Sequence, residues 1–368
     1  MHRIAQSWLV LQITGDARML GFVVAAQFAP MLFLAPWAGV LADRYDRRRL
    51  LQWTQIGMGL QALALGLLTL SGHASGALVL LFAAILGIVT ALDGPARQSI
   101  VSDLVPADQV VNAVALNSAN FNAARLVGPA VAGLMIAAWG PGWVFLVNAA
   151  TFAAMYAALT RIRLTRREGA RRTGGLRDGL RYVRGRPDLW FVIGTAGAVA
   201  MLVFNFPITS ALMVTDQFGA DARSYGVLAS LMAVGSLAAA LVAARRGRTD
   251  LKLVALAAVA AGGTVITAGV MPSVPTFAAA LVACGAAALT MMTAANSYLQ
   301  THSDTEHRSR VMALYMAVFF GTTPAGAPLI GLLADDFGAR AAMVVPGMVS
   351  LVVTAGLVAA YLWARRRA

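Results

Sequence analysis

The stretch GVLADRYDRRRLL at residues 39–51 sets a dense group of charges between two long apolar runs. It holds two aspartates, four arginines and a tyrosine within thirteen residues. Over the whole chain of 368 residues, 59% are hydrophobic and 12% are charged, and a soluble domain carries about twice that charged share. The composition therefore predicts an integral membrane protein in which this stretch is a loop between two membrane helices.

The basic residues recur in short clusters between apolar segments. The formal net charge is +13, which would suit a nucleic-acid partner only if the basic side chains shared one solvated face. Instead they fall in alternate connectors, which the positive-inside rule places in the cytoplasm. The clusters lie within residues 44–49, 161–186, 245–248 and 365–367. We expect a multi-pass protein of the cytoplasmic membrane with a cytoplasmic C-terminus and with the lipid bilayer, not nucleic acid, as its partner.

The apolar segments predict an all-α membrane protein. A helix needs about 20 apolar residues to cross about 30 Å of hydrocarbon. By this rule the full spans are 18–42, 49–71, 77–101, 110–138, 141–160, 189–213, 221–244, 252–271, 275–299, 309–334 and 340–363. Residues 4–14 ahead of them make about half a crossing. The connectors alternate regularly in charge, so this half helix is expected to leave the cytoplasm and to bring the count from eleven full spans to a twelve-helix type.

The chain is expected to consist of two six-helix halves, residues 1–160 and 189–368, joined by a cytoplasmic linker at 161–188. The halves echo each other at an offset near 198 residues. In this echo Gly128, Pro129, Gly133 and Gly140 correspond to Ala327, Pro328, Gly331 and Gly338. Parallel repeats of this kind are typical of transporters whose site lies between the halves. Within the linker, Leu176, Leu180 and Val183 share one helical stripe, which predicts either an interfacial helix on anionic lipid or a solvated linker.

The opening stretch carries a family resemblance. Gly39, Leu41, Ala42, Asp43, Arg44, Arg47 and Arg48 match the G-x-L-a-D-R-x-x-R-R loop of the major facilitator superfamily. Residues 93–148 and 307–315 are similar to bacterial exporters of the enterobactin-exporter and macrolide-efflux type, the third drug:proton antiporter group, with Ser309 in place of a glycine. The resemblance implies a major facilitator fold, a bacterial cytoplasmic membrane location and a monomer.

The resemblance implies a cytoplasmic gate built from Gly39, Asp43, Arg44, Arg47 and Arg48. A carboxylate at a helix end can sit on the positive end of a neighbouring helix dipole. In the family, the residue matched by Asp43 docks in this way at the start of the helix near residue 309 in the outward-open state. The alternative is that these arginines only set the topology.

Gly128, Pro129 and Gly133 resemble the glycine-rich antiporter motif of the fifth helix, which seals exporters from the cytoplasm. This chain carries alanine at three places where that motif usually has glycine, namely Ala115, Ala124 and Ala132. Small residues let helix backbones approach closely, so generic close packing is the alternative explanation.

Proton coupling needs a carboxylate at membrane depth, and Asp93 is the acidic residue that falls well inside a predicted span. Arg97 follows one turn later, and Arg125 lies inside the next helix. We expect Asp93 and Arg125 to couple transport to protons. A permanent structural ion pair between the two helices is the alternative.

Amide and aromatic side chains on several predicted spans suggest a polar lining for an amphipathic ligand. The residues that we expect to line it are Gln27, Asn117, Phe121, Asn148, Asn205 and Asn296. Each amide alone could instead make an interhelical hydrogen bond, worth about 0.6 kcal/mol on average.

Other protein classes lack support in the sequence. The four histidines lie at helix ends or in connectors, the single cysteine, Cys284, lies in an apolar run, and no metal, nucleophile or phosphate-loop motif occurs. We expect no enzyme, no cofactor and no metal, but a secondary transporter that exports a small amphipathic compound, a drug or a siderophore-like metabolite, by proton antiport and alternating access. The alternatives are an uptake facilitator and an inactive, truncated remnant or scaffold. The truncated remnant is an alternative because residues 5–15 resemble the second half of the family's first helix, with about 30 residues expected before it.

Overall fold

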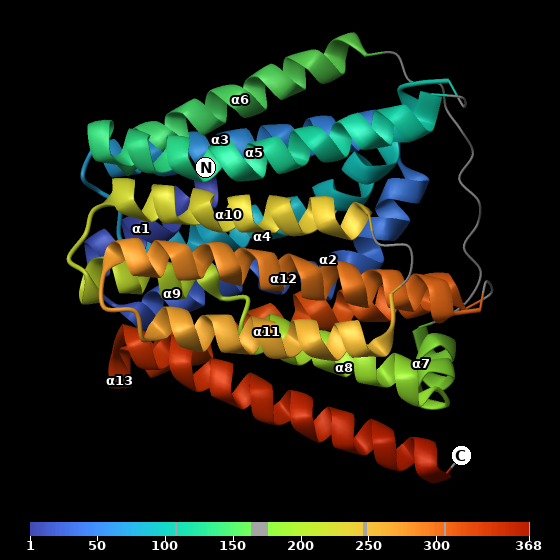
Figure 1. The fold of residues 1–368 in the computed structure, drawn as a ribbon. Helices are drawn as coiled ribbons and strands as arrows, with labels where there is room; N and C mark the ends of the chain where they lie inside the picture. Colours follow the sequence, from blue (N-terminus) through green and yellow to red (C-terminus); the bar gives the residue numbers. More distant parts are fainter. Residues whose placement is uncertain (107–108, 163–175, 246–248, 305–306, 368) are drawn as a thin grey trace. The chain divides into compact units, whose positions relative to one another are not determined.

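The structure, a computed structural model, describes residues 1–106, 109–162, 176–245, 249–304 and 307–367 (Figure 1). The chain separates into unit 1, Met1–Arg171 with Asp221–Val227, and unit 2, Arg172–Ala220 with Leu228–Ala368. Regular structure in the described residues is helical throughout. Nine helical segments of the described residues, with Pro187–Gln217 counted as one, are long and apolar enough to cross a membrane, which agrees with the composition.

Unit 1 is built from six helices. They are α1 (His2–Thr14), α2 (Ala17–Arg44), α3 (Arg47–Leu70), α4 (Gly76–Asp103), α5 (Val110–Trp139) and α6 (Pro141–Arg161). Helix α2 packs along α4, and α3 packs along α4 and α6. Every helix lies within two residues of its predicted bounds, because each apolar run ends at a turn residue or a charge that cannot enter lipid.

Unit 2 contains α7 (Leu176–Arg184), α8 (Pro187–Leu202), α9 (Phe206–Leu212), the π-helical turn η2 (Met213–Gln217), α11 (Leu251–Gly269), α12 (Val274–His302) and α13 (Arg308–Arg367). Helix α10 (Ala222–Ala244) starts in unit 1 and continues in unit 2. Helix α13 packs against α8 and α11, and α11 also packs against α12. The predicted amphipathic linker segment is α7, whose Val183 is buried while Leu180 is 38% exposed.

The charged stretch is a short connector because Asp46 starts the next helix. Its side chain accepts a hydrogen bond from the backbone N–H of Arg49 at 3.0 Å and so satisfies one of the free donors at the start of α3. Ser75 and Asp250 cap α4 and α11 in the same way. The three residues are the turn formers that the sequence places before apolar runs.

The predicted span 189–213 is not one continuous helix, and this expectation is corrected. Helix α8 ends at Leu202, and α9 begins only at Phe206, after Asn205 with φ −93° and ψ 30°. The cause is Pro207 in the first turn of α9, since a proline has no N–H to donate to the preceding turn. The Asn205 side-chain amide donates instead to the Met201 carbonyl at 2.7 Å, which satisfies part of the freed backbone.

Glycine corners relate the two halves of the sequence. Gly140, between α5 and α6, has φ 85° and ψ 167°. Gly338, inside α13, has φ 85° and ψ 166° and divides α13 into two helices near the predicted boundary between spans 309–334 and 340–363. The two positions differ by the offset of the predicted repeat, so the correspondence extends to backbone conformation.

We predict that Gly338→Ala lowers the free energy of unfolding by about 1–3 kcal/mol, because this φ/ψ region is accessible only to glycine. Thermal unfolding of the purified protein in detergent measures the change. Gly356→Ala is the matched control, since Gly356 lies within a helix of the same element and a Cβ there meets no atom within 4 Å. Equal melting temperatures for Gly338→Ala and wild type would contradict the prediction.

Candidate functional site

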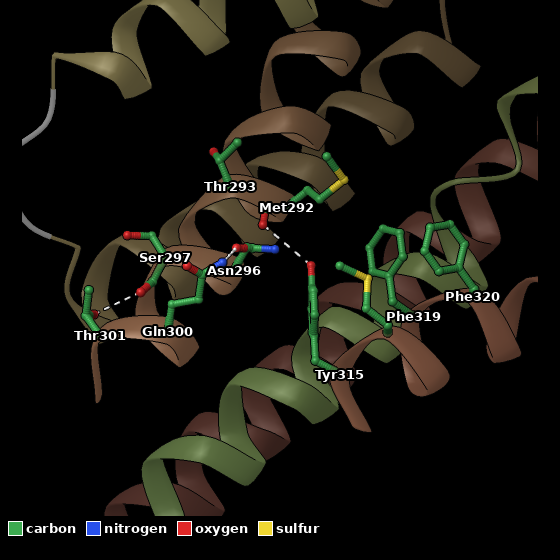
Figure 2. Close-up of a pocket in the computed structure, with 10 residues that line it drawn as sticks. Met292, Thr293, Asn296, Ser297, Gln300, Thr301, Tyr315, Phe319 and Phe320 are labelled. Carbon is green, nitrogen blue, oxygen red and sulfur yellow. Dashed lines mark hydrogen bonds between the residues drawn. The ribbon is translucent and has the colours of Figure 1, made fainter. Parts of the chain in front are cut away.

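A cavity of about 430 Å³ lies between α12 and the first half of α13 in unit 2 (Figure 2). This volume is within the range of small-molecule sites, roughly 300–1,000 Å³. Its lining residues are Met292, Thr293, Asn296, Ser297, Gln300 and Thr301 of α12 with Tyr315, Met316, Phe319 and Phe320 of α13. The lining contains amides, hydroxyls, thioethers and aromatic rings but no residue that is charged at neutral pH.

One wall of the cavity is polar. The α12 residues follow a four-residue spacing, which places them on one helical face. The Gln300 amide donates to the Asn296 side-chain oxygen at 2.5 Å, and Thr249 donates to the Ser297 hydroxyl at 3.2 Å. The Asn296 amide nitrogen is turned toward the wall that carries Tyr315 (Figure 2). This wall can therefore hold a ligand by hydrogen bonds.

The opposite wall is aromatic. The rings of Tyr315 and Phe319 are 5.7 Å apart between centroids, and Phe319 meets Phe320 edge to face at 5.4 Å. Phe319 also meets Phe204 at 5.6 Å, within the interrupted segment between α8 and α9. The helix break therefore adjoins the aromatic wall. Helix interruptions of this type occur at transporter binding sites because they free backbone polar groups at membrane depth.

Asn296 is the residue of the predicted lining that this cavity includes. Asn205 lies at the helix break, and its side-chain oxygen is buried without a partner in the structure. In unit 1, Gln27 is buried and donates to Gln6, while Asn148 is within 3.2 Å of His2. Asn117 is exposed, and the side chain of Phe121 lies outside the described residues. A substrate role for the six remains a prediction.

Sequence analysis missed the aromatic wall. Tyr315, Phe319 and Phe320 stand within YMAVFF at residues 315–320, which reads as ordinary apolar helix. The spacing of four between Tyr315 and Phe319 was an available signal. It could not be distinguished from lipid-facing aromatic residues without knowledge of the helix that packs opposite.

Asp93 is held by a dense set of donors in unit 1. It is buried and accepts hydrogen bonds from the Thr54 hydroxyl at 2.7 Å and the Gln55 amide at 3.0 Å, both from α3. Arg97, one turn later on α4, approaches it at 2.6 Å and 3.2 Å. Among the described residues, Asp93 therefore forms its ion pair with Arg97 of its own helix, α4. The side chain of Arg125 lies outside the described residues, so its coupling with Asp93 remains a prediction.

The predicted gate is described in part. The side chains of Asp43 and Arg44, and the surroundings of Gly39, lie outside the described part of the structure. Arg48 donates to the Thr160 carbonyl at the end of α6 at 2.5 Å, which ties the start of α3 to α6. A gating role for these residues remains a prediction.

The predicted antiporter motif contains a close helix crossing. A Cβ at Gly133 would come within 2.7 Å of the Gly226 Cα, and a Cβ at Gly226 would come within 2.7 Å of the Pro129 carbonyl oxygen. Helix α5 and the first turns of α10 therefore touch backbone to backbone in unit 1. Close packing is the observed property of Gly133, and a sealing role remains a prediction.

A second polar network lies around Arg186, at the N-terminal end of α8 in unit 2. The Arg186 guanidinium donates to both oxygens of Asp188, at 3.0 Å and 2.9 Å, and the Tyr298 hydroxyl donates to the same carboxylate at 3.1 Å. The hydrogen-bonded carboxylate raises the pKa of Arg186 above its ordinary value. Arg186 also donates to the His302 carbonyl at 3.2 Å and so fastens α8 to the end of α12.

Metal binding finds no support in the part of the chain that the structure describes, where no three His, Cys, Asp or Glu residues gather. Cys284 is buried and has no disulfide partner there.

Comparisons with known proteins place this geometry in context. A family model described as transmembrane secretion effector, of the major facilitator superfamily, matches residues 1–365. The Staphyloferrin A transporter of Staphylococcus aureus is 28% identical over 244 residues, which are 65% of this chain and 62% of that protein. The multidrug efflux pump Tap of Mycobacterium tuberculosis is 26% identical over 388 residues, covering 99% of this chain and 89% of Tap.

Among solved structures, a bacterial homolog of the human lysosomal transporter Spinster, in an inward-facing and unoccupied conformation, superimposes with a TM-score of 0.77. It is 19% identical, and the match covers 99% of this chain and 94% of that one. At this identity the likeness establishes the fold alone, which is the predicted major facilitator fold.

Proposed function

Because the chain belongs to the transmembrane secretion effector family of the major facilitator superfamily, we propose that it exports a small amphipathic compound across the bacterial cytoplasmic membrane. The observation that carries the proposal is the cavity of unit 2, where a hydrogen-bonding wall faces an aromatic one. Such a site suits a ligand with a polar edge and an apolar body. Relatives named as a siderophore transporter and as a multidrug efflux pump support a drug or siderophore-like substrate.

The mechanism we propose is proton antiport with alternating access. Residues 1–160 and 189–368 act as the two six-helix halves, the linker 161–188 and the C-terminus lie in the cytoplasm, and the protein works as a monomer. Asp93 carries the coupling proton, Arg125 holds Asp93 ionised when the two are paired, and the Gly39–Arg48 stretch closes the cytoplasmic side. The arginine clusters on alternate connectors support the orientation.

We predict that Asn296→Leu and Phe319→Ala weaken transport through the cavity. The half-saturating substrate concentration should rise about 3–10-fold, as expected for the loss of one hydrogen bond or one aromatic contact. The measurement is efflux of preloaded Nile red from cells that lack their main efflux pumps. Val352→Ala, at a position that is 71% exposed on α13, is the control. Efflux at the wild-type level in both cavity variants would remove the cavity from the transport path.

We predict that Asp93→Asn abolishes uphill, proton-driven efflux in proteoliposomes and leaves downhill exchange of the dye within about threefold of wild type, because the amide cannot bind and release a proton at neutral pH. The matched control is Asp216→Asn, an exposed acid of unit 2. Uphill efflux in Asp93→Asn that a protonophore still stops would exclude Asp93 from coupling. Loss of both activities together with a lower melting temperature would show a purely structural anchor.

For the gate we predict that Asp43→Asn slows dye efflux at least about fivefold, because a carboxylate at a helix N-terminus contributes up to about 2 kcal/mol in a partly buried setting. Dye binding to the purified protein should stay within about twofold. Unchanged efflux would refute a gating role for Asp43, and a parallel loss of dye binding would point to misfolding.

A further inference from the structure

Arg3 is a cation on α1 for which the proposed transport mechanism has no use. Its side chain is accessible at the surface of the described residues but lies deep among the helices of unit 1, and Gln6 and Ser7 of the same helix are 0% and 1% exposed. The guanidinium carbon lies 4.5 Å from the centroid of the Phe28 ring on α2. A guanidinium stacked on an aromatic face keeps its N–H edge free for another partner.

The Phe28 ring fixes the depth of this cation. Phe28 is eleven residues after Ala17, the first residue of the membrane span Ala17–Leu34. At about 1.5 Å per residue this is about 17 Å from the start of the span, near the middle of a hydrocarbon layer about 30 Å thick. Arg3 is in contact with Phe28 and therefore lies near the same depth.

Arg3 has no carboxylate partner among the described residues. The described ion pairs join Arg97 to Asp93 and Arg186 to Asp188, and the contact described for Arg3 is the Phe28 ring. A cation facing lipid at this depth is strongly disfavoured, so such groups face water or an anionic partner. Among the described residues, this guanidinium at mid-depth is thus placed to meet an anion.

Neighbouring hydrogen bonds hold α1 in place around Arg3. The Gln27 amide donates to the Gln6 side-chain oxygen at 2.9 Å, and the Gln6 amide donates to the Val79 carbonyl of α4 at 3.1 Å. On the other side, His2 is buried against the Phe145 ring at 5.0 Å and lies 3.2 Å from Asn148. Because α1 is tied to α2, α4 and α6, the guanidinium is positioned before any ligand arrives.

We propose that Arg3 and Phe28 form an anion-binding subsite for an amphipathic organic anion, in which the guanidinium binds a carboxylate or sulfonate and the ring contacts the apolar body. The substrate class of the proposed export is then an organic acid, and in this sense the inference rests on the proposed function. Arginine suits this task because its fork of donors matches a carboxylate with two parallel hydrogen bonds. The cavity of unit 2, whose lining has no charged residue, offers no such group.

The test is a pair of probes of nearly equal size and shape, the anionic 2-naphthoate and the neutral 2-naphthamide. Binding to the purified full chain in phosphatidylcholine nanodiscs is measured by calorimetry. The wild type should prefer naphthoate by about tenfold or more, as a charge-assisted bidentate contact implies. Arg3→Gln should remove this preference and leave naphthamide binding unchanged, whereas Arg3→Lys, which keeps the charge but loses the fork of donors, should keep part of it. Arg245→Gln, an exposed arginine at the end of α10, controls for net charge.

Two results would overturn the inference. One is a wild type that binds both probes equally or binds neither. The other is an Arg3→Gln variant that keeps the naphthoate preference at a wild-type melting temperature. If Arg3→Gln does not fold, Phe28→Leu replaces it, since loss of the ring should lower the affinity for both probes while the preference for the anion remains. Unchanged affinities in Phe28→Leu would remove the ring from the subsite.

A lipid headgroup carries the same anionic chemistry, and a second arm separates it from a soluble anion. Phosphatidylglycerol added to the nanodiscs should leave naphthoate affinity unchanged, and competition by this lipid would overturn the assignment to a soluble organic acid. Export of preloaded 2-naphthoate from proteoliposomes by the same variants is an independent readout. Absent efflux with an intact naphthoate preference would remove the proposed function alone, and normal efflux without the preference would remove the subsite alone.

Discussion

The structure depends above all on the need to satisfy every backbone polar group without water. In hydrocarbon a free N–H or C=O costs several kcal/mol, so the chain crosses as helices that satisfy these groups internally. Where a helix is interrupted, neighbouring groups satisfy or cover the backbone that is freed. At the break before α9, the Asn205 side chain takes over as donor to the Met201 carbonyl, and Gly326 of α13 packs its backbone directly onto the same carbonyl. The corner at Gly338 bends the chain between two spans at a residue without a side chain.

Close approach of helices follows from the same constraint. Lipid tails are as apolar as leucine, so helix association in a membrane relies on tight packing and not on the hydrophobic effect. In unit 2, Gly235 faces the Val282 carbonyl and Gly285 faces the Met232 carbonyl, and the Ser236 hydroxyl donates to the Gly285 carbonyl at 3.0 Å. In unit 1, Gly133 and Gly226 make the equivalent backbone contact. Glycine at these four positions sets how closely the helices can approach.

Charge at depth is the second constraint. Asp93 lies inside α4 and accepts four hydrogen bonds from Thr54, Gln55 and Arg97. These neighbouring donors offset its negative charge. Arg3 differs, since its described contact is an aromatic ring.

The sequence by itself determined the helices, with their bounds to within two residues in unit 1, and the family. It also determined the positions of the corners at Gly140 and Gly338. The reason is that runs of apolar residues, and the glycines and charges that interrupt them, are local signals. Tertiary structure alone decided which polar residues meet. Asp93 pairs with Arg97 on its own helix, Asn296 faces Tyr315 and Phe319 of α13, and Arg3 stacks on Phe28. Such contacts join side chains on different helices or select one of several neighbours on a helix face. They depend on how each helix is rotated about its axis, and a nearly uniform apolar sequence encodes that rotation only weakly.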